Sequence, residues 1–112
     1  MAYNDLSWSP SEKKAARAAF DKALEVALAS TIAEFKRKAD APATPADLWE
    51  IEEYLGQRRR KIDRMFDYRY SQLPEVFASL IRAGYLDENL LSGLSQEKRE
   101  MIHRFATWKP RG

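Results

Sequence analysis

One stretch of the sequence, residues 47–70, combines a helical apolar period with charges that are sorted along its length. Acidic residues fill its first half and basic residues its second half, with Gly56 between them. Its apolar residues recur at steps of three, four and seven, the spacing of one helix face; they are Leu48, Ile51, Leu55, Ile62, Met65 or Phe66, and Leu73 just beyond. The pattern predicts an amphipathic helix around which the rest of the chain is organised.

Capping signals mark the start of this helix and of another long helix before it. Residues 9–12, Ser-Pro-Ser-Glu, form a capping box with proline at the first helical position, and no glycine or further proline interrupts the stretch that follows. Residues 44–47, Thr-Pro-Ala-Asp, repeat this pattern after a break over residues 40–46 that contains two prolines. We therefore expect two long helices, at residues 10–39 and 44–70.

A cluster of short helices is expected over residues 73–108. Pro74 lacks a backbone donor, so a new helix start near it is favoured over an unbroken helix, and Gly84 is placed to end this third helix in a left-handed conformation. Residues 87–91 can add one short helical turn, and Ser95 is placed to cap a last helix. No segment shows the period-two alternation of a strand.

The predicted fold is all-α, a single domain over residues 1–112 with a long antiparallel helical hairpin and a cluster of short helices. Two helices alone leave apolar surface uncovered, and a symmetric dimer is the common remedy in a small helical chain. If the residue 47–70 helices of two copies cross antiparallel near Gly56, the acidic half of each lies beside the basic half of the other. The alternative is that these charges are simply solvated, in which case each exposed ion pair contributes about 0–1 kcal/mol. We expect a homodimer whose interface contains Leu48, Ile51, Leu55, Gly56 and Ile62.

Composition limits the class of protein. With 112 residues, 45% apolar and 32% charged, the chain has the profile of one folded, soluble domain. It has no cysteine for a disulfide or a thiolate metal site, and no apolar run approaches the about 20 residues that cross a bilayer. The N-terminus also lacks a basic region followed by an apolar core. We expect a cytoplasmic protein whose net charge of +2 gives no general attraction for polyanions.

Motifs that could carry chemistry are weak. Glu100 and His103 have the Glu-x-x-His spacing of di-iron helical bundles, but one copy occurs, supporting inward glutamates are not evident and the spacing is common by chance. The sequence contains no cysteine nucleophile, Gly-x-Ser-x-Gly motif or phosphate-binding glycine loop. We therefore expect no enzyme activity, no metal site and no cofactor.

The densest basic run, residues 58–61, has a composition found in nucleic-acid-binding sites. Four successive helical residues point in four directions, however, and the acidic residues of the same helix would repel phosphates. The stripe spacing places Arg58 or Arg59 near the apolar face, where a guanidinium needs a carboxylate partner. Nucleic-acid binding is therefore the weakest of the function hypotheses.

Trp49 lies about one position off the apolar stripe, on an edge that it shares with Glu52, Glu53, Gly56 and Arg60. It is either the rim of the core, partly buried in the dimer, or an exposed aromatic residue of the kind that anchors protein interfaces. The sequence pattern leaves both interpretations open.

Two segments carry a family resemblance: Asp47-Leu48-Trp49-x-Ile51-x-x-Tyr54-Leu55 and Arg58-Arg59-x-x-Ile62-Asp63-x-x-Phe66-Asp67-Tyr68-Arg69-Tyr70-Ser71. Together they resemble the central motif of the fluorescence recovery proteins of cyanobacteria. The similarity extends outward to Trp8-Ser9-x-x-Glu12 and Phe20, and to Val76-Phe77-Ala78-x-Leu80 and Gly84. It covers nearly the whole chain, and the combination is far more specific than any short motif.

The resemblance implies an all-helical homodimer without a cofactor. It also implies binding to the light-activated orange carotenoid protein, chiefly to its C-terminal domain, and a faster return of that protein to its inactive orange form. This return detaches the carotenoid protein from the phycobilisome and ends the quenching of antenna fluorescence.

Some positions depart from the family pattern. In the family the tryptophan is followed by a His-Asp pair and later by an arginine, which together form a functional patch. Trp49 and Arg59 match, but the pair is Glu52-Glu53 here, and Arg60 replaces the histidine commonly found after the arginine. These changes alter the charge of the docking surface that the resemblance implies.

The function hypothesis is a non-enzymatic regulator that binds another protein and shifts its conformational equilibrium. The alternative is a family-like dimeric interaction module with a different client, such as a regulator in a non-photosynthetic cell. The predicted protein-binding residues are Trp49, Glu52, Glu53, Arg59 and Arg60, with Phe77 and its neighbours as a second surface on the short-helix cluster.

Overall fold

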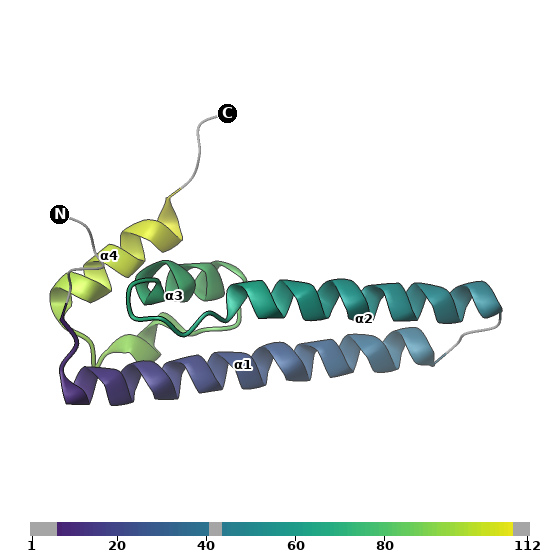
Figure 1. Cartoon of the computed structure of the whole chain (residues 1–112), viewed down its shortest axis with the longest axis horizontal. Coiled ribbons are helices and arrows are strands. Elements are labelled where there is room, and N and C mark those ends of the chain that lie inside the picture. Colours follow the sequence, from purple (N-terminus) through teal and green to yellow (C-terminus); the bar gives the residue numbers. More distant parts are fainter. Residues whose placement is uncertain (1–6, 41–43, 109–112) are drawn as a thin grey trace.

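Two long helices project from a cluster of shorter ones, as Figure 1 shows. The computed structural model describes residues 7–40 and 44–108, and these contain no strand, which confirms the all-helical prediction. In chain order the helices are α1 (Pro10–Ala39), α2 (Pro45–Met65), α3 (Leu73–Arg82), the 3-10 helix η2 (Glu88–Leu91) and α4 (Gln96–Thr107). The break predicted over residues 40–46 lies partly outside the described residues.

Both long helices begin at the predicted capping boxes. The Ser9 Oγ accepts the backbone N–H of Glu12 at 3.1 Å, while the Glu12 Oε1 accepts the backbone N–H of Ser9 at 3.0 Å. Thr44 and Asp47 form the same pair of bonds at the start of α2, at 3.3 and 3.1 Å. Each box satisfies backbone donors that a helix start leaves free, which is why these short motifs locate the helix starts.

The C-terminal end of α2 differs from the prediction. The sequence predicts a helix to residue 70, but α2 ends at Met65, and Phe66 leaves the helical conformation with φ −100° and ψ 71°. The rings of Phe66 and Tyr68 pack edge-on against Phe20 of α1, at centroid distances of 5.3 and 4.8 Å. An unbroken helix would turn these two rings in different directions, so packing against α1 replaces the last turn that the periodicity predicts.

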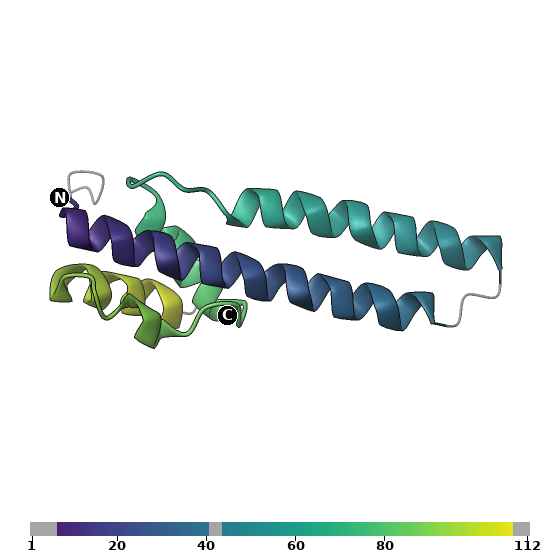
Figure 2. The ribbon, with the colours of Figure 1, turned by 90° about the horizontal axis from the view of Figure 1, so that it is seen from below.

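The hydrophobic core lies where the N-terminal part of α1 meets the short helices. Figures 1 and 2 show α3, η2 and α4 gathered beside this part of α1, while α2 runs antiparallel to α1 and extends the hairpin beyond the cluster. The buried residues of α1 are mostly alanines, which allow close packing; they are Ala16, Ala19, Phe20, Ala23 and Ala27. Opposite them, Phe77 and Leu80 of α3 and Ile102 of α4 are fully buried.

Two glycines shape the short-helix cluster. Gly84 follows α3 with φ 81°, which confirms the left-handed end that the sequence predicts. Gly93 lies so close to α1 that a Cβ atom added to it would stand 2.7 Å from the Cβ of Ala15. A side chain at position 93 would therefore push η2 and α1 apart.

The apolar stripe of the hairpin is covered along only part of its length. Ala27 is the last buried residue of α1, and α2, which the structure describes in full, has no buried residue. Apart from Trp49, the large exposed hydrophobic residues of the hairpin are Leu28, Ile32 and Phe35 on α1 and Leu48 and Leu55 on α2, and we call these five the hairpin apolar set. Within a single chain, the outer half of the hairpin leaves this set open to solvent.

Candidate protein-binding surface

The residues predicted to bind a partner project from α2 into solvent. Trp49 is 63% exposed, so in the single chain it is not the rim of a core. The other four, Glu52, Glu53, Arg59 and Arg60, are exposed as well. We call these five residues the α2 patch. It joins an aromatic side chain with charges of both signs, a composition suited to a protein interface.

Local contacts order part of the α2 patch. A Cβ atom on Gly56 would stand 3.5 Å from Nη1 of Arg60, so the guanidinium lies back along the helix beside the glycine. One turn earlier, the Glu53 carboxylate accepts a hydrogen bond from Nε2 of Gln57 at 3.2 Å. A methyl group at position 56 would therefore make only an ordinary contact with Arg60.

The residues predicted to form the dimer interface divide into two groups. Leu48 and Leu55 are 54% and 37% exposed, while Ile51, Gly56 and Ile62 are half-buried. Leu55 and Ile62 line a groove of about 260 Å³ together with Leu28 and Thr31 of α1, whereas Gly56 lies on the side of α2 that carries Trp49. The interface itself stays a prediction.

Phe77, predicted as part of a second binding surface, lies inside the protein. Its side chain is 0% exposed and belongs to the core formed by α1, α3 and α4. The i, i+3, i+4 spacing of α3 marks a buried face, and Phe77 sits at the centre of that face. The prediction of Phe77 as a contact residue is therefore wrong for this conformation.

Arg58 does point toward the rest of the chain, but its partners differ from the predicted carboxylate. Its Nε donates to Oγ1 of Thr31 on α1 at 3.0 Å, and its Nη2 donates to the hydroxyl of Tyr85 after α3. Within residues 7–40 and 44–108, no carboxylate pairs with this guanidinium. The spacing of α2 indicated that either Arg58 or Arg59 turns inward, but nothing in the sequence pointed to Thr31 or Tyr85.

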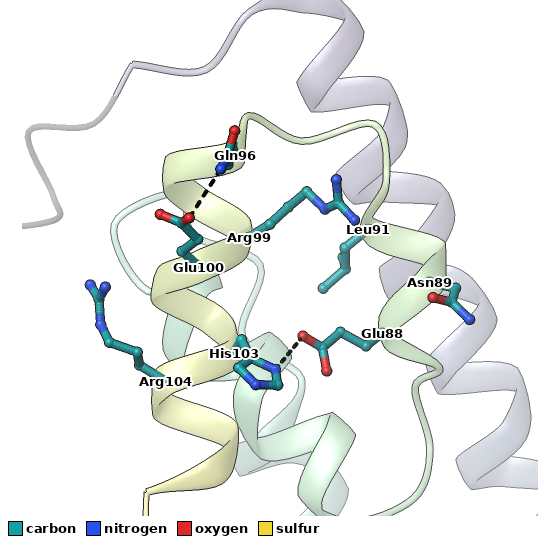
Figure 3. Close-up of a pocket in the computed structure, with 8 residues that line it drawn as sticks. All are labelled: Glu88, Asn89, Leu91, Gln96, Arg99, Glu100, His103 and Arg104. Carbon is teal, nitrogen blue, oxygen red and sulfur yellow. Dashed lines mark hydrogen bonds and ion pairs between the residues drawn. The ribbon is translucent and has the colours of Figure 1, made fainter.

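A polar pocket of about 760 Å³ lies between η2 and α4. Figure 3 shows Glu88 reaching from η2 toward His103 of α4, with 2.9 Å between the carboxylate and Nδ1, while Glu100 accepts a hydrogen bond from Gln96 at 3.1 Å. Glu100 and His103 thus have separate partners. No group of three metal-ligating side chains occurs among the described residues, so the Glu-x-x-His motif receives no support as a metal site.

The environment of Tyr68 favours the neutral form of its side chain. Burial raises its pKa to about 12, and the neighbouring Tyr70 acts in the same direction, while the Arg17 guanidinium, 4.7 Å from the ring centroid, opposes the rise. A phenol with this pKa is protonated at neutral pH. Tyr68 is therefore suited to packing rather than to acting as a base.

Trp108 is an exposed aromatic residue at the end of the predicted short-helix cluster. It is 67% exposed and lines a groove of about 270 Å³ between α3 and α4, together with Ala78 and Phe105. Its spacing from Phe105, three residues or nearly one turn, was the signal that could have placed it on the same side of the last helix.

The all-helical fold and the exposed α2 patch are those of a protein suited to binding another protein. None of the helices in the described part of the chain is long and apolar enough to cross a membrane.

Comparison with known proteins identifies the family. The family model described as photoprotection regulator fluorescence recovery protein matches residues 8–106. The fluorescence recovery protein of Synechocystis sp. PCC 6803 is 31% identical over 99 residues, which cover 88% of this chain and 91% of that protein. The chain belongs to the fluorescence recovery protein family of photoprotection regulators.

Solved structures of the family share the fold. The structure of the Fremyella diplosiphon protein matches with a TM-score of 0.87 at 36% identity, covering 91% of this chain and 100% of that one. The structure from Synechocystis sp. PCC 6803 matches with a TM-score of 0.86 at 30% identity and the same coverage.

Proposed function

We propose that the protein binds a light-activated orange carotenoid protein and accelerates its return to the inactive orange form. The observation that carries this proposal is the exposed α2 patch, in which Trp49, Glu53 and Arg59 stand on the surface of a member of the fluorescence recovery family. Reversion would release the carotenoid protein from the phycobilisome and end its quenching of antenna fluorescence.

No chemistry is required for such an action. A protein accelerates a conformational change when it binds the transition state of that change more tightly than the activated starting state. An exposed tryptophan supplies contact area, and the charges beside it supply orientation and attraction. The α2 patch contains both.

The proposed form is a homodimer that covers the hairpin apolar set. Leu48 and Leu55 on α2, with Leu28, Ile32 and Phe35 on α1, expose apolar surface that a second copy can bury. An antiparallel arrangement of two α2 helices would set the acidic half of each beside the basic half of the other. Charge pattern and exposed apolar surface therefore support the same assembly.

The experiment is a dark-reversion assay. A photoactivated orange carotenoid protein is mixed with this protein in the dark, and the decay of the red form is followed by absorbance. We expect faster decay, an unchanged yield of forward photoconversion, and a smaller effect at high salt because charged contacts are screened. If several orange carotenoid proteins show neither acceleration nor a complex at low salt, the proposal fails.

A different client is the second candidate function. The observation in its favour is the exposed Glu52-Glu53 pair, which places two carboxylates beside Trp49 where the family pattern has a histidine and an aspartate. A client with a basic surface would suit this pair better. Binding of such a protein together with no effect on carotenoid proteins would select this alternative.

A further inference from the structure

Arg58 is a side chain of α2 that contacts two other elements at once. Its Nε donates to Thr31 of α1 at 3.0 Å, its Nη2 donates to the Tyr85 hydroxyl, and its Cζ lies 5.3 Å from the centroid of the Tyr85 ring. The Thr31 hydroxyl donates in turn to the carbonyl of Ala27 at 2.9 Å. This bond fixes the direction of the Thr31 oxygen, so the acceptor for Arg58 is already oriented.

These contacts lie where the core ends. Ala27 is the last buried residue of α1, and Thr31 follows one turn later. On the other side, Tyr85 directly follows Gly84, the left-handed residue that ends α3. Arg58 therefore joins the hairpin to the short-helix cluster at the boundary between the covered and the uncovered part of the stripe.

Apart from Arg58, α2 contacts the rest of the chain through half-buried side chains, such as Met65, which packs against the core at the inner end of the helix. No residue of this helix, described in full, is buried, and near its outer end Tyr54 lies under the ammonium of Lys38, 5.1 Å from the ring centroid. Such an exposed cation–π contact contributes about 0.5–1 kcal/mol. A half-buried guanidinium with two directed hydrogen bonds is thus well placed to set the rotation of α2 about its own axis.

That rotation decides where the α2 patch faces. Successive helical residues are about 100° apart, so an inward Arg58 places its neighbour Arg59 at the flank of α2, where it lines the outer edge of a groove with Leu28 and Thr31 of α1. Trp49 precedes Arg58 by nine residues, which is about two and a half turns, so it lies on the opposite side of the helix. Both residues are exposed, as this geometry requires.

We propose that Arg58 is a positioning residue, which holds α2 against Thr31 and Tyr85 so that Trp49 and Arg59 face a partner. Its effect on a client rests on the proposed function, whereas its effect on the orientation of α2 does not. A lysine cannot replace it, because a single ammonium lacks the planar fork that reaches two acceptors in different directions.

The test removes one contact at a time. Tyr85→Phe deletes the hydroxyl and keeps the ring, and Arg58→Lys keeps the charge and removes the fork. The matched controls are Tyr54→Phe on the same hairpin and Arg64→Lys, an exposed residue of α2 outside the patch. Because the chain has no cysteine, spin labels at Glu50→Cys and Glu97→Cys can report the distance between α2 and α4, diluted with unlabelled chain.

We expect both Arg58→Lys and Tyr85→Phe to broaden or shift the α2–α4 distance distribution, and both controls to leave it unchanged. Affinity for the photoactivated carotenoid protein should fall by about threefold to tenfold, the equivalent of one net hydrogen bond. The double variant should lose little more than either single variant, since both delete parts of one contact.

Two results would overturn the proposal. One is an unchanged distance distribution in both variants. The other is a broadened distribution with wild-type client affinity, which would mean that the Arg58 contact holds α2 in place but does not affect how Trp49 and Arg59 meet the client. If the wild-type protein binds no carotenoid protein at all, the proposed function fails and the distance measurement alone decides whether Arg58 positions α2.

Discussion

The Lys98 ammonium lies 3.1 Å from the Glu12 carboxylate, and this buried pair joins the start of α4 to the start of α1. Glu12 also accepts the backbone N–H of Ser9 at 3.0 Å and that of Ser95 at 2.8 Å. Lys98 is 4% exposed, and its Nζ donates further to the carbonyl of Ser7 at 2.6 Å. One carboxylate therefore completes the capping of two helices that are distant in the sequence.

Glu12 should make the free energy of unfolding fall at acid pH. The backbone N–H of Ser9, helped by that of Ser95 and by Lys98, lowers the Glu12 pKa from 4.5 to about 2 in spite of burial. The folded chain thus binds this proton less readily than the unfolded chain, so the contribution is complete above about pH 4.5 and is lost as pH falls toward 2. Urea unfolding from pH 6 to 2 should show the loss, and Glu12→Gln should be less stable at pH 6 with a weaker acid dependence. An identical pH profile in the variant would contradict this assignment.

Gly93 and Gly56 should respond to alanine in opposite ways. A Cβ at position 93 meets the Cβ of Ala15 at 2.7 Å, so Gly93→Ala should lower the free energy of unfolding by about 1–3 kcal/mol. At position 56 the nearest atom is Nη1 of the flexible Arg60 side chain, at 3.5 Å. Because position 56 lies inside a helix, Gly56→Ala should raise the free energy of unfolding by about 1 kcal/mol. Both are measured by urea unfolding in the Leu48→Glu background, where the proposed dimer contributes nothing.

Leu48 tests the proposed dimer. Leu48 is 54% exposed in the single chain, so Leu48→Glu should keep the fold but place a carboxylate in the apolar seam, at a cost of several kcal/mol in association. Sedimentation should show a dimeric wild type and a monomeric variant at micromolar concentration. Leu90→Glu is the matched control, because Leu90 is 45% exposed on η2. A wild type that is monomeric, or a variant that remains dimeric, would remove the basis for this assembly.

Trp49 and Phe77 should separate binding from folding. Trp49→Ala removes an exposed ring, so we expect little change in unfolding and a loss of dark-reversion activity. Phe77→Ala leaves a cavity in the core and should lower stability by about 3–5 kcal/mol. Circular dichroism melts and the reversion assay, run on both variants, check the assignment. Full activity in Trp49→Ala would exclude the α2 patch as the docking surface.

The Glu52-Glu53 pair distinguishes a retuned docking surface from an interchain contact. If the pair weakens docking, Glu52→His with Glu53→Asp should strengthen client binding by more than either change alone, with the dimer unaffected. If Glu52 instead pairs with Arg60 of a second copy, dimer stability should fall and binding should change little. A double-mutant cycle on Glu52 and Arg60 decides: coupling of about 0.5 kcal/mol or more in dimer dissociation favours the interchain pair.

Local backbone chemistry is what the sequence by itself determined. The capping boxes at residues 9–12 and 44–47 and the left-handed Gly84 all lie where the sequence predicts them. In each capping box, side chains accept backbone N–H groups no more than four residues away. At Gly84, the absence of a side chain allows the left-handed conformation that ends the helix. Such contacts form whatever the rest of the chain does, which is why sequence motifs suffice for them.

Surfaces contributed by distant residues are what only the tertiary structure decided. Phe66 and Tyr68 end α2 early because Phe20, far away in the sequence, offers them a packing surface. The same reason puts Phe77 in the core and gives Arg58 hydroxyl partners instead of a carboxylate. Periodicity shows that a helix has an apolar side, but which element covers that side, and how far along the helix, depends on the burial that all elements gain together.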